Sequence, residues 1–194
     1  MGVARQSATT EAEGYLDVGD YTSVYDGQLF TMSGWVKLSA PALNQVIFAR
    51  RNSDTDGGWG FSVGWSDLNS FAVKGAANRA PLIYHGDLSG GEWAHVVLSY
   101  GNDVCHATIN GTACGGDLQI YSVWGGQNLP LAFGCYNNGT KTYAPAMFDE
   151  LRLRKEKVSR DFAVAEYATQ ASSTFLSTSG AMDLKVPGLT ILVR

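Results

Sequence analysis

Short stretches in which apolar and polar residues alternate recur along the chain. Neighbouring residues of a β-strand point to opposite faces of a sheet, so this alternation predicts strands with one buried face. Glycine, asparagine, aspartate and serine separate the stretches, as is typical of turns. The pattern therefore predicts an all-β fold of two packed antiparallel sheets. The eleven predicted strands are YLDVGDY (15–21), FTMSGWVKLS (30–39), QVIFAR (45–50), GWGFSVGW (58–65), FAVKG (71–75), LIYHG (82–86), EWAHVVLSY (92–100), VCHATIN (104–110), LQIYSVW (118–124), LPLAFGCY (129–136) and MFDELRLR (147–154).

Helical periodicity is confined to one segment, SRDFAVAEYATQ, at residues 159–170. Ser159 is a candidate N-cap, and an aspartate follows it in the first turn. Phe162, Ala165 and Glu166 then recur at the three- and four-residue spacing of one helix face. The segment predicts one short helix that closes the sandwich.

Two turn signals lie close together in EWAHVVLSYGNDVCHATINGTACGG, residues 92–116. The first is Gly101-Asn102-Asp103 and the second is Asn110-Gly111. Asparagine and glycine accept the positive φ that tight hairpin turns require. The segment therefore predicts three adjacent antiparallel strands.

Three cysteines, Cys105, Cys114 and Cys135, leave at least one thiol unpaired within the chain. With a two-residue hairpin loop, Cys105 and Cys114 share a strand face but are diagonal neighbours, which are usually too far apart for a disulfide. A shifted register would allow a Cys105–Cys114 bridge, with Cys135 as the unpaired thiol. The alternative is that all three are small buried apolar side chains.

Composition favours a single globular domain. The chain has 194 residues, of which 45% are hydrophobic and 16% charged, so it can bury a sizeable core. The formal net charge is −4 and the sequence pI about 5.3, which argues against nucleic acid as a partner. The sequence lacks an apolar run of about 18 residues, so we expect no membrane insertion. The N-terminal residues lack the apolar core of a signal peptide, and we expect the chain to be a segment of a longer one.

Four motifs, in order, resemble the laminin-G-like jelly-roll family, whose members are also described as concanavalin A-like lectin/glucanase domains. The resemblance implies a two-sheet antiparallel jelly roll at residues 15–175, preceded by a flexible segment at 1–14 and followed by a linker or extra strand at 176–194. FAVAEYATQASSTFLS also resembles the tail of modules from large bacterial surface or secreted proteins. The motifs are FTMSGWVKLS (30–39), GGEWAHVVLSYGNDVCHATINGTACGG (90–116), LPLAFGCYNNG (129–139) and FDELRLRKEKVSRD (148–161).

Adjacent carboxylates at Asp149 and Glu150 raise the question of glycosidase activity, because retaining glycosidases use two carboxyl groups about 5 Å apart. Strict alternation instead separates them, placing Asp149 on the face of Leu151 and Glu150 on the face of Arg152. The Glu-x-Asp-x-x-Glu spacing of the family's glucanases is also absent. We therefore predict no catalytic residue, with Asp149 as a buried hydrogen-bond acceptor and Glu150 in a surface ion pair.

The remaining titratable and aromatic residues of the strands suggest structural roles. His95 alternates with Trp93, and both are expected in the core, as is Trp35. The other histidines, His85 and His106, lack metal-ligand spacing, so no metal site is predicted. The asparagine and aspartate pattern of calcium-binding family members is not recognisable, and no cofactor is expected.

Sugar binding remains as the candidate function. Sugars stack on aromatic side chains, while polar side chains contact their hydroxyl groups. Candidates of both kinds are expected on the predicted loops or on the strand residues beside them, because functional residues concentrate on loops. The alternative for each aromatic residue is an ordinary place in the core. The candidates are Arg51, Trp59, Tyr121, Trp124, Tyr136, Asn137, Asn138 and Tyr143.

These observations predict a non-catalytic module of a larger extracellular or cell-surface protein. Its expected partner is a glycan or an extracellular protein surface. The main alternative is a structural spacer that packs against neighbouring domains of the same chain. A glycoside hydrolase is the minor alternative.

Overall fold

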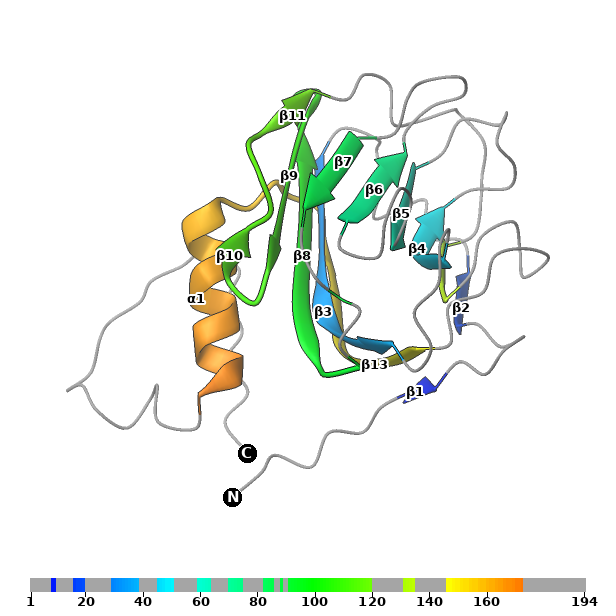
Figure 1. The fold of residues 1–194 in the computed structure, drawn as a ribbon. Coiled ribbons are helices and arrows are strands. Elements are labelled where there is room, and N and C mark those ends of the chain that lie inside the picture. The colour runs from blue at the N-terminus through cyan, green and yellow to red at the C-terminus, as the bar shows by residue number, and fades with distance from the viewer. Residues whose placement is uncertain are drawn as a thin grey trace.

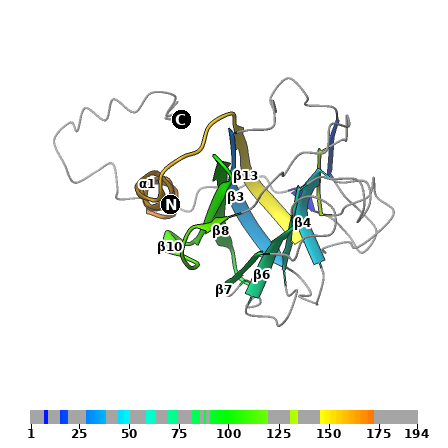
Figure 2. The same cartoon turned by 90° about the horizontal axis from the view of Figure 1, so that it is seen from above.

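The computed structural model describes residues 8–9, 16–19, 29–38, 45–50, 59–63, 70–74, 82–85, 88, 91–119, 131–134 and 146–172. They form two antiparallel sheets that face each other and one helix that lies outside this pair (Figures 1 and 2). The elements are β1 (Ala8–Thr9), β2 (Leu16–Gly19), β3 (Leu29–Leu38), β4 (Gln45–Arg50), β5 (Trp59–Val63), β6 (Ser70–Lys74), β7 (Leu82–His85), β8 (Ala94–Gly101), β9 (Val104–Ile109), β10 (Thr112–Ala113), β11 (Leu118–Gln119), β12 (Leu131–Phe133), β13 (Ala146–Arg154) and α1 (Arg160–Ala171).

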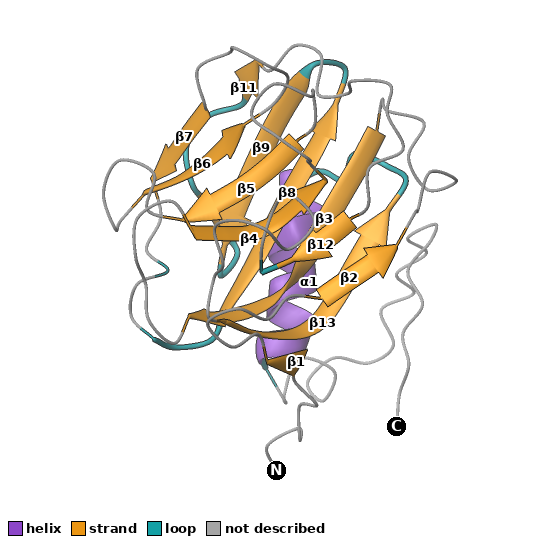
Figure 3. Ribbon diagram, turned by 90° about the vertical axis from the view of Figure 1, so that its right-hand side faces the viewer, coloured by secondary structure: helices purple, strands orange, loops and turns teal. Residues whose placement is uncertain are grey.

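The larger sheet has seven strands in the order β1-β13-β3-β8-β9-β10, with β11 also paired to β9. The smaller sheet has the order β2-β12-β4-β5-β6-β7. Figure 3 shows the smaller sheet in front of the larger one, with α1 behind both. Each of the eleven predicted strands overlaps an observed strand, and β10 corresponds to the third strand expected around the hairpin turns, so among the described strands only the two-residue β1 was not predicted. The predicted all-β sandwich is therefore confirmed.

The core fills the space between the two sheets. Among the side chains that the structure describes, alternate residues of the larger sheet supply most of the core, because one face of each strand is turned inward. From the smaller sheet, Ile47 and Phe133 are almost fully buried. The rings of Phe133 and Phe148 meet edge to face at 5.8 Å between centroids and thereby join the sheets. The larger sheet contributes Phe30, Met32, Val36, Leu38, Ala94, Val96, Leu98, Tyr100, Cys105, Ala107, Ile109, Ala146 and Phe148.

The three adjacent strands predicted around the two hairpin turns are observed as β8, β9 and β10. Asn102 and Asp103 both have positive φ, as do Asn110 and Gly111. These residue types adopt such angles at little cost, which explains the tight turns. The Oδ1 atom of Asn110 also accepts a hydrogen bond of 2.8 Å from the backbone N–H of His95, which ties the second turn to β8.

The hairpin register separates two cysteines. Thr112 faces Ile109, and the backbone N–H of Cys114 donates to the carbonyl of Ala107, so Cys105 lies one diagonal away from Cys114. Both cysteines are buried and carry thiols rather than a shared disulfide. The disulfide considered from the sequence is therefore wrong, because the loop has two residues and the register is not shifted.

We expect Cys114 to resist alkylation in the folded protein. Burial raises the pKa of its thiol to about 11. At pH 8 roughly one thiol in a thousand is then a thiolate, the form that reacts with iodoacetamide. Peptide mass spectrometry should show slow labelling in buffer, faster labelling as the pH rises towards 11, and rapid labelling in urea. Equal labelling rates for folded and unfolded protein at pH 8 would contradict this expectation.

The helix α1 begins where the sequence predicted. The side chain of Ser159 accepts a hydrogen bond of 3.1 Å from the backbone N–H of Phe162, so Ser159 is the N-cap. The buried positions are Ala163 and Glu166, whereas Ala165, which was expected to share the inner face, is exposed. A charged residue thus lies at the centre of the face that contacts the sheet.

Candidate functional site

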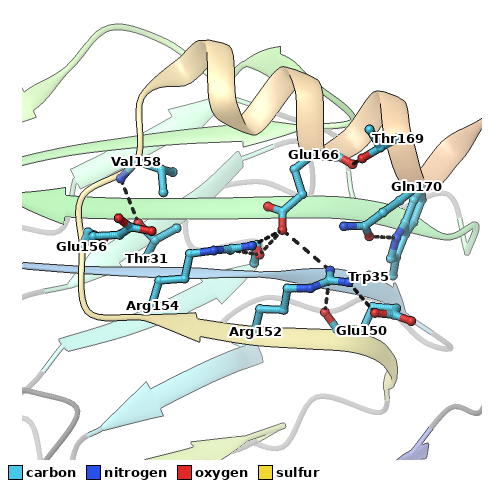
Figure 4. A network of polar contacts seen from close by, with 11 residues as sticks. Thr31, Trp35, Glu150, Arg152, Arg154, Glu156, Val158, Glu166, Thr169 and Gln170 are labelled. Atoms are coloured by element: carbon cyan, nitrogen blue, oxygen red, sulfur yellow. Dashed lines mark hydrogen bonds and ion pairs between the residues drawn. The ribbon is translucent and has the colours of Figure 1, made fainter. Parts of the chain in front are cut away.

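The outer face of the seven-stranded sheet is the best-defined candidate site, because α1 covers it and a network of polar contacts joins the two (Figures 2 and 4). The strand residues that face the helix are mostly polar, in contrast to those that face the other sheet. Buried polar residues on this face are Thr31, Ser33, His95, Ser99, His106 and Thr108.

A β-bulge in β13 decides which of its side chains reach this face. Asp149 pairs with Trp35 and Arg152 pairs with Ser33, so β13 carries one extra residue between these pairs. Residues directly opposite in an antiparallel pair share a face. Asp149 and Arg152 therefore lie on the helix side with Trp35 and Ser33. The residue at the bulge, Glu150, has a φ of 53°.

The bulge overturns the faces that strict alternation assigned. Leu151 packs against the core, on the side of Phe148, and not beside Asp149 as predicted. Gly34 makes room for this shift, since a Cβ atom there would lie 2.7 Å from Leu151 Cδ2 and 3.1 Å from Leu151 Cα. Asp149 is 7% exposed, so its burial was predicted correctly although its face was not. Its predicted role as a hydrogen-bond acceptor stays a prediction.

Glu166 is the centre of the polar network, and its side chain is almost fully buried. One carboxylate oxygen, Oε1, lies 2.7 Å from Arg154 Nη2 and 3.7 Å from Arg152 Nη1. The hydroxyl of Ser33 donates to the same oxygen at 3.2 Å and accepts from Arg154 Nη1 at 3.0 Å. The guanidinium of Arg154 also lies 5.0 Å from the ring centre of Phe162. Two strands and the helix thus hold one carboxylate (Figure 4).

Glu150 forms the surface ion pair that the sequence predicted. Its carboxylate contacts Arg152 Nη2, and its side chain is 53% exposed. An exposed pair of this kind contributes about 0–1 kcal/mol to stability. Glu150 points to solvent and Asp149 is buried, so the two adjacent carboxylates of β13 do not face each other across one site.

Aromatic rings gather at the C-terminal end of α1. Trp35 and His95 meet at 5.2 Å between ring centres, and Tyr167 of the helix lies 5.9 Å from Trp35 and 6.1 Å from His95. The indole N–H of Trp35 donates to Gln170 Oε1 at 2.8 Å. His95 is fully buried, as expected, but it lies beneath the helix and not between the two sheets. Trp93, predicted to be in the core, is only partly buried just before β8.

Polar residues of the larger sheet also hold the loop between β13 and α1, at the end of the outer face near the start of the helix. Thr31 donates to the carbonyl of Glu156 at 2.6 Å and accepts from the backbone N–H of Val158 at 3.1 Å. The carbonyl of Val158 accepts from Ser99 and lies 2.8 Å from His106 Nε2. Burial lowers the pKa of His106, which favours the neutral ring at this contact. The loop therefore sets the position from which α1 crosses the sheet.

The described residues contain no group of three histidine, cysteine, aspartate or glutamate side chains arranged to hold a metal ion. Across the same part of the chain, no helix has the length and apolarity that a membrane span requires. The chemistry of the described face is therefore that of hydrogen bonding, ion pairing and aromatic contact.

Comparison with protein families decides the identity of the fold. The family model described as the concanavalin A-like lectin/glucanases superfamily matches residues 10–161. The chain belongs to this superfamily. The match confirms the resemblance inferred from the four sequence motifs, and it ends where α1 begins. No curated protein matches this concanavalin A-like domain in sequence.

Solved structures share the fold at low sequence identity. A botulinum neurotoxin DC binding domain in complex with rat synaptotagmin II is 12% identical, with a TM-score of 0.61 over 84% of this chain and 42% of that one. A botulinum neurotoxin type C structure, described as depending on two ganglioside molecules to enter cells, gives the same values. Trypanosoma rangeli sialidase is 16% identical, with a TM-score of 0.54 over 74% of this chain and 23% of that one. The concanavalin A-like domain thus spans less than half of each of these chains.

Most of the sugar-binding residues predicted from the sequence lie outside the described residues. Trp59 is the first residue of β5 and pairs with Arg50, so it belongs to a strand end and not to a loop. Its side chain is not among those described, and the C-terminal stretch 176–194 is not described either. The residues of the concanavalin A-like domain that lie outside are Arg51, Tyr121, Trp124, Tyr136, Asn137, Asn138 and Tyr143, together with Cys135.

The sequence did not predict the network around Glu166. Its members come from β3, β13 and α1, which are far apart in the sequence. The available signal was a glutamate on the expected inner face of the helix, which requires a cationic partner if buried. The bulge that places Arg152 and Arg154 on that face has no sequence signal that we recognised.

Proposed function

We propose that this domain is a non-catalytic binding module that recognises a glycan. The observation that carries the proposal is the superfamily match over residues 10–161. Two further likenesses support it. The type C neurotoxin structure is described as interacting with gangliosides, and another neurotoxin binding domain is in complex with SialylT. Both share the fold of this chain at 11–12% identity.

The positions of Asp149, Glu150 and Glu166 support a binding role over hydrolysis by these residues. A retaining glycosidase needs two carboxyl groups about 5 Å apart that both reach the substrate. In β13 Glu150 is paired with Arg152 at the surface and Asp149 is buried, while Glu166 is held by Arg154. Incubation with a β-glucan should therefore release no reducing sugar. Hydrolysis that disappears in Glu150→Gln would support an enzyme instead.

We place the glycan at loops that the sequence singled out, with Trp124 as the main stacking residue. Aromatic faces and a few polar groups are the usual lining of small-ligand sites. The domain would act as one module of a larger extracellular protein, which is the setting that the family resemblance implies. The botulinum neurotoxin DC binding domain in complex with rat synaptotagmin II is a chain that contains this fold and binds a protein.

A glycan array followed by calorimetry tests this function. The wild-type domain should bind at least one glycan, and Trp124→Ala should weaken that binding about tenfold or more, which corresponds to about 1.4 kcal/mol. Val164→Ala is the matched control, because Val164 is 45% exposed on α1 and should bind as the wild type does. Failure of the wild type to bind any glycan would favour the spacer, and equal binding by Trp124→Ala would remove Trp124 from the site.

A further inference from the structure

The face beneath α1 has the composition of a ligand surface. A helix that packs on a sheet usually covers an apolar stripe, because apolar burial provides most of the docking free energy. Here the apolar contact consists of Val97, Val158, Ala163 and the partly buried Phe162, together with the ring of Trp35, which packs against Tyr167 of the helix. The rest of the covered face carries hydroxyl, imidazole and guanidinium groups. Such groups are readily hydrated, so uncovering them costs less than uncovering an apolar face.

Some of these polar groups are poorly satisfied while the helix is in place. Thr108 Oγ1, His106 Nδ1 and Glu166 Oε2 are buried without a hydrogen-bond partner among the described residues. A buried polar atom without a partner costs about 1–3 kcal/mol relative to its hydrated state. Opening the helix would return these atoms to water, which offsets part of the docking free energy.

The contacts of Glu166 are those that a carboxylate ligand would make. Arginine guanidinium groups and a serine hydroxyl converge on one carboxylate oxygen, with Arg152 and Arg154 on the same strand face. Arginine is the residue best suited to carboxylates, because its planar group offers several donors. The carboxylate at this place is supplied by the chain itself.

We propose that the outer face of the seven-stranded sheet is a second binding surface, for a carboxylate-bearing sugar, which α1 covers and Glu166 occupies as an internal ligand. The ligand carboxylate replaces that of Glu166 between Arg152 and Arg154. The sugar hydroxyls meet Ser33 and Thr108, and Trp35 offers an aromatic face once Tyr167 has moved away. Trp35 already packs against a ring, that of Tyr167, so an occupant with a flat apolar face fits there, and the proposed glycan function selects a sugar as that occupant.

This inference rests on the proposed function and adds to it a ligand class and a second surface. The two can fail separately, because the first is tested at Trp124, which is outside the described residues, and the second at Glu166 and Arg154. Loss of glycan binding in Trp124→Ala tests the first site, and the variants below leave Trp124 in place.

Calorimetry with trigalacturonic acid and with neutral galactotriose tests the proposal. Glu166→Gln keeps the size of the side chain but removes the internal carboxylate, so it should bind trigalacturonic acid about tenfold or more tightly than the wild type does. The double variant Glu166→Gln/Arg154→Gln should lose this gain. Gln170→Ala is the matched control, because it loosens the same helix at Trp35 and leaves the internal carboxylate in place.

The proposal is overturned if Glu166→Gln gains no affinity, if the gain survives in the double variant, or if galactotriose or a polyglutamate peptide gains equally. A measurement on the wild type covers the case in which a variant does not fold. Saturating trigalacturonic acid should increase amide hydrogen exchange along α1, and galactotriose should not. Unchanged exchange in α1 with trigalacturonic acid would also overturn the proposal.

Discussion

Replacing Phe148 with alanine is expected to lower the free energy of unfolding by about 3–5 kcal/mol. Phe148 is 1% exposed, and its ring meets that of Phe133 from the opposite sheet. Truncation removes apolar contact on both sides of the core and leaves a cavity that rigid strands fill only in part. Urea denaturation followed by tryptophan fluorescence measures the change.

Phe148→Leu is the matched control, since it keeps an apolar side chain at the same place. We expect this variant to lose clearly less stability than Phe148→Ala, because the remaining cavity is smaller. A loss below about 1 kcal/mol for Phe148→Ala would show that the contact between the sheets does not contribute as the structure indicates.

Arg154→Gln is expected to cost about 3 kcal/mol, the lower end of the range for breaking a buried ion pair. The change removes the closest cationic partner of Glu166, whose side chain is 3% exposed. Arg152 lies 3.7 Å from the same carboxylate and compensates in part. The charge left beneath α1 is then poorly solvated, and the helix is expected to loosen first. Denaturation with urea gives the total loss, and hydrogen exchange locates it.

A double-mutant cycle separates the ion pair from the loss of packing. The double variant Arg154→Gln/Glu166→Gln removes both charges, so it should be at least about 1 kcal/mol more stable than Arg154→Gln. Thr169→Ala on the outer turn of α1 is a control that leaves both charges in place. Additive losses in the two single variants would contradict a coupled pair.

The candidate site was predicted less well than the fold, and β13 shows why. Alternation gave the location of this strand and the burial of Asp149. Alternation placed the wrong residues on the same face as Asp149. The one extra residue at the bulge reverses the face of every later residue of β13. The space for that residue is provided by Gly34 of another strand. A pattern read along one strand contains no information about its neighbour.

The helix α1 and the β9–β10 hairpin show which features could be predicted from the sequence and which could not. The start of α1 was predicted because its cap, Ser159, bonds to a backbone group three residues away. The turn at Asn110-Gly111 was predicted because both residues adopt positive φ locally. The partners of Glu166 were not predicted, since Ser33 lies 133 residues away from it in the sequence.

The sequence by itself determined nearly all the described strands, the turns, the described helix and the superfamily. Each of these depends on periodicity or on residue types within a few positions, and so follows from local backbone preferences and from which face must be buried. Only the tertiary structure decided which sheet face each residue of β13 takes after the bulge, the thiol state of Cys105 and Cys114, and the carboxylate contacts beneath α1. These depend on strand register and on distances between segments far apart in the chain, which are set when the sheets and the helix pack together.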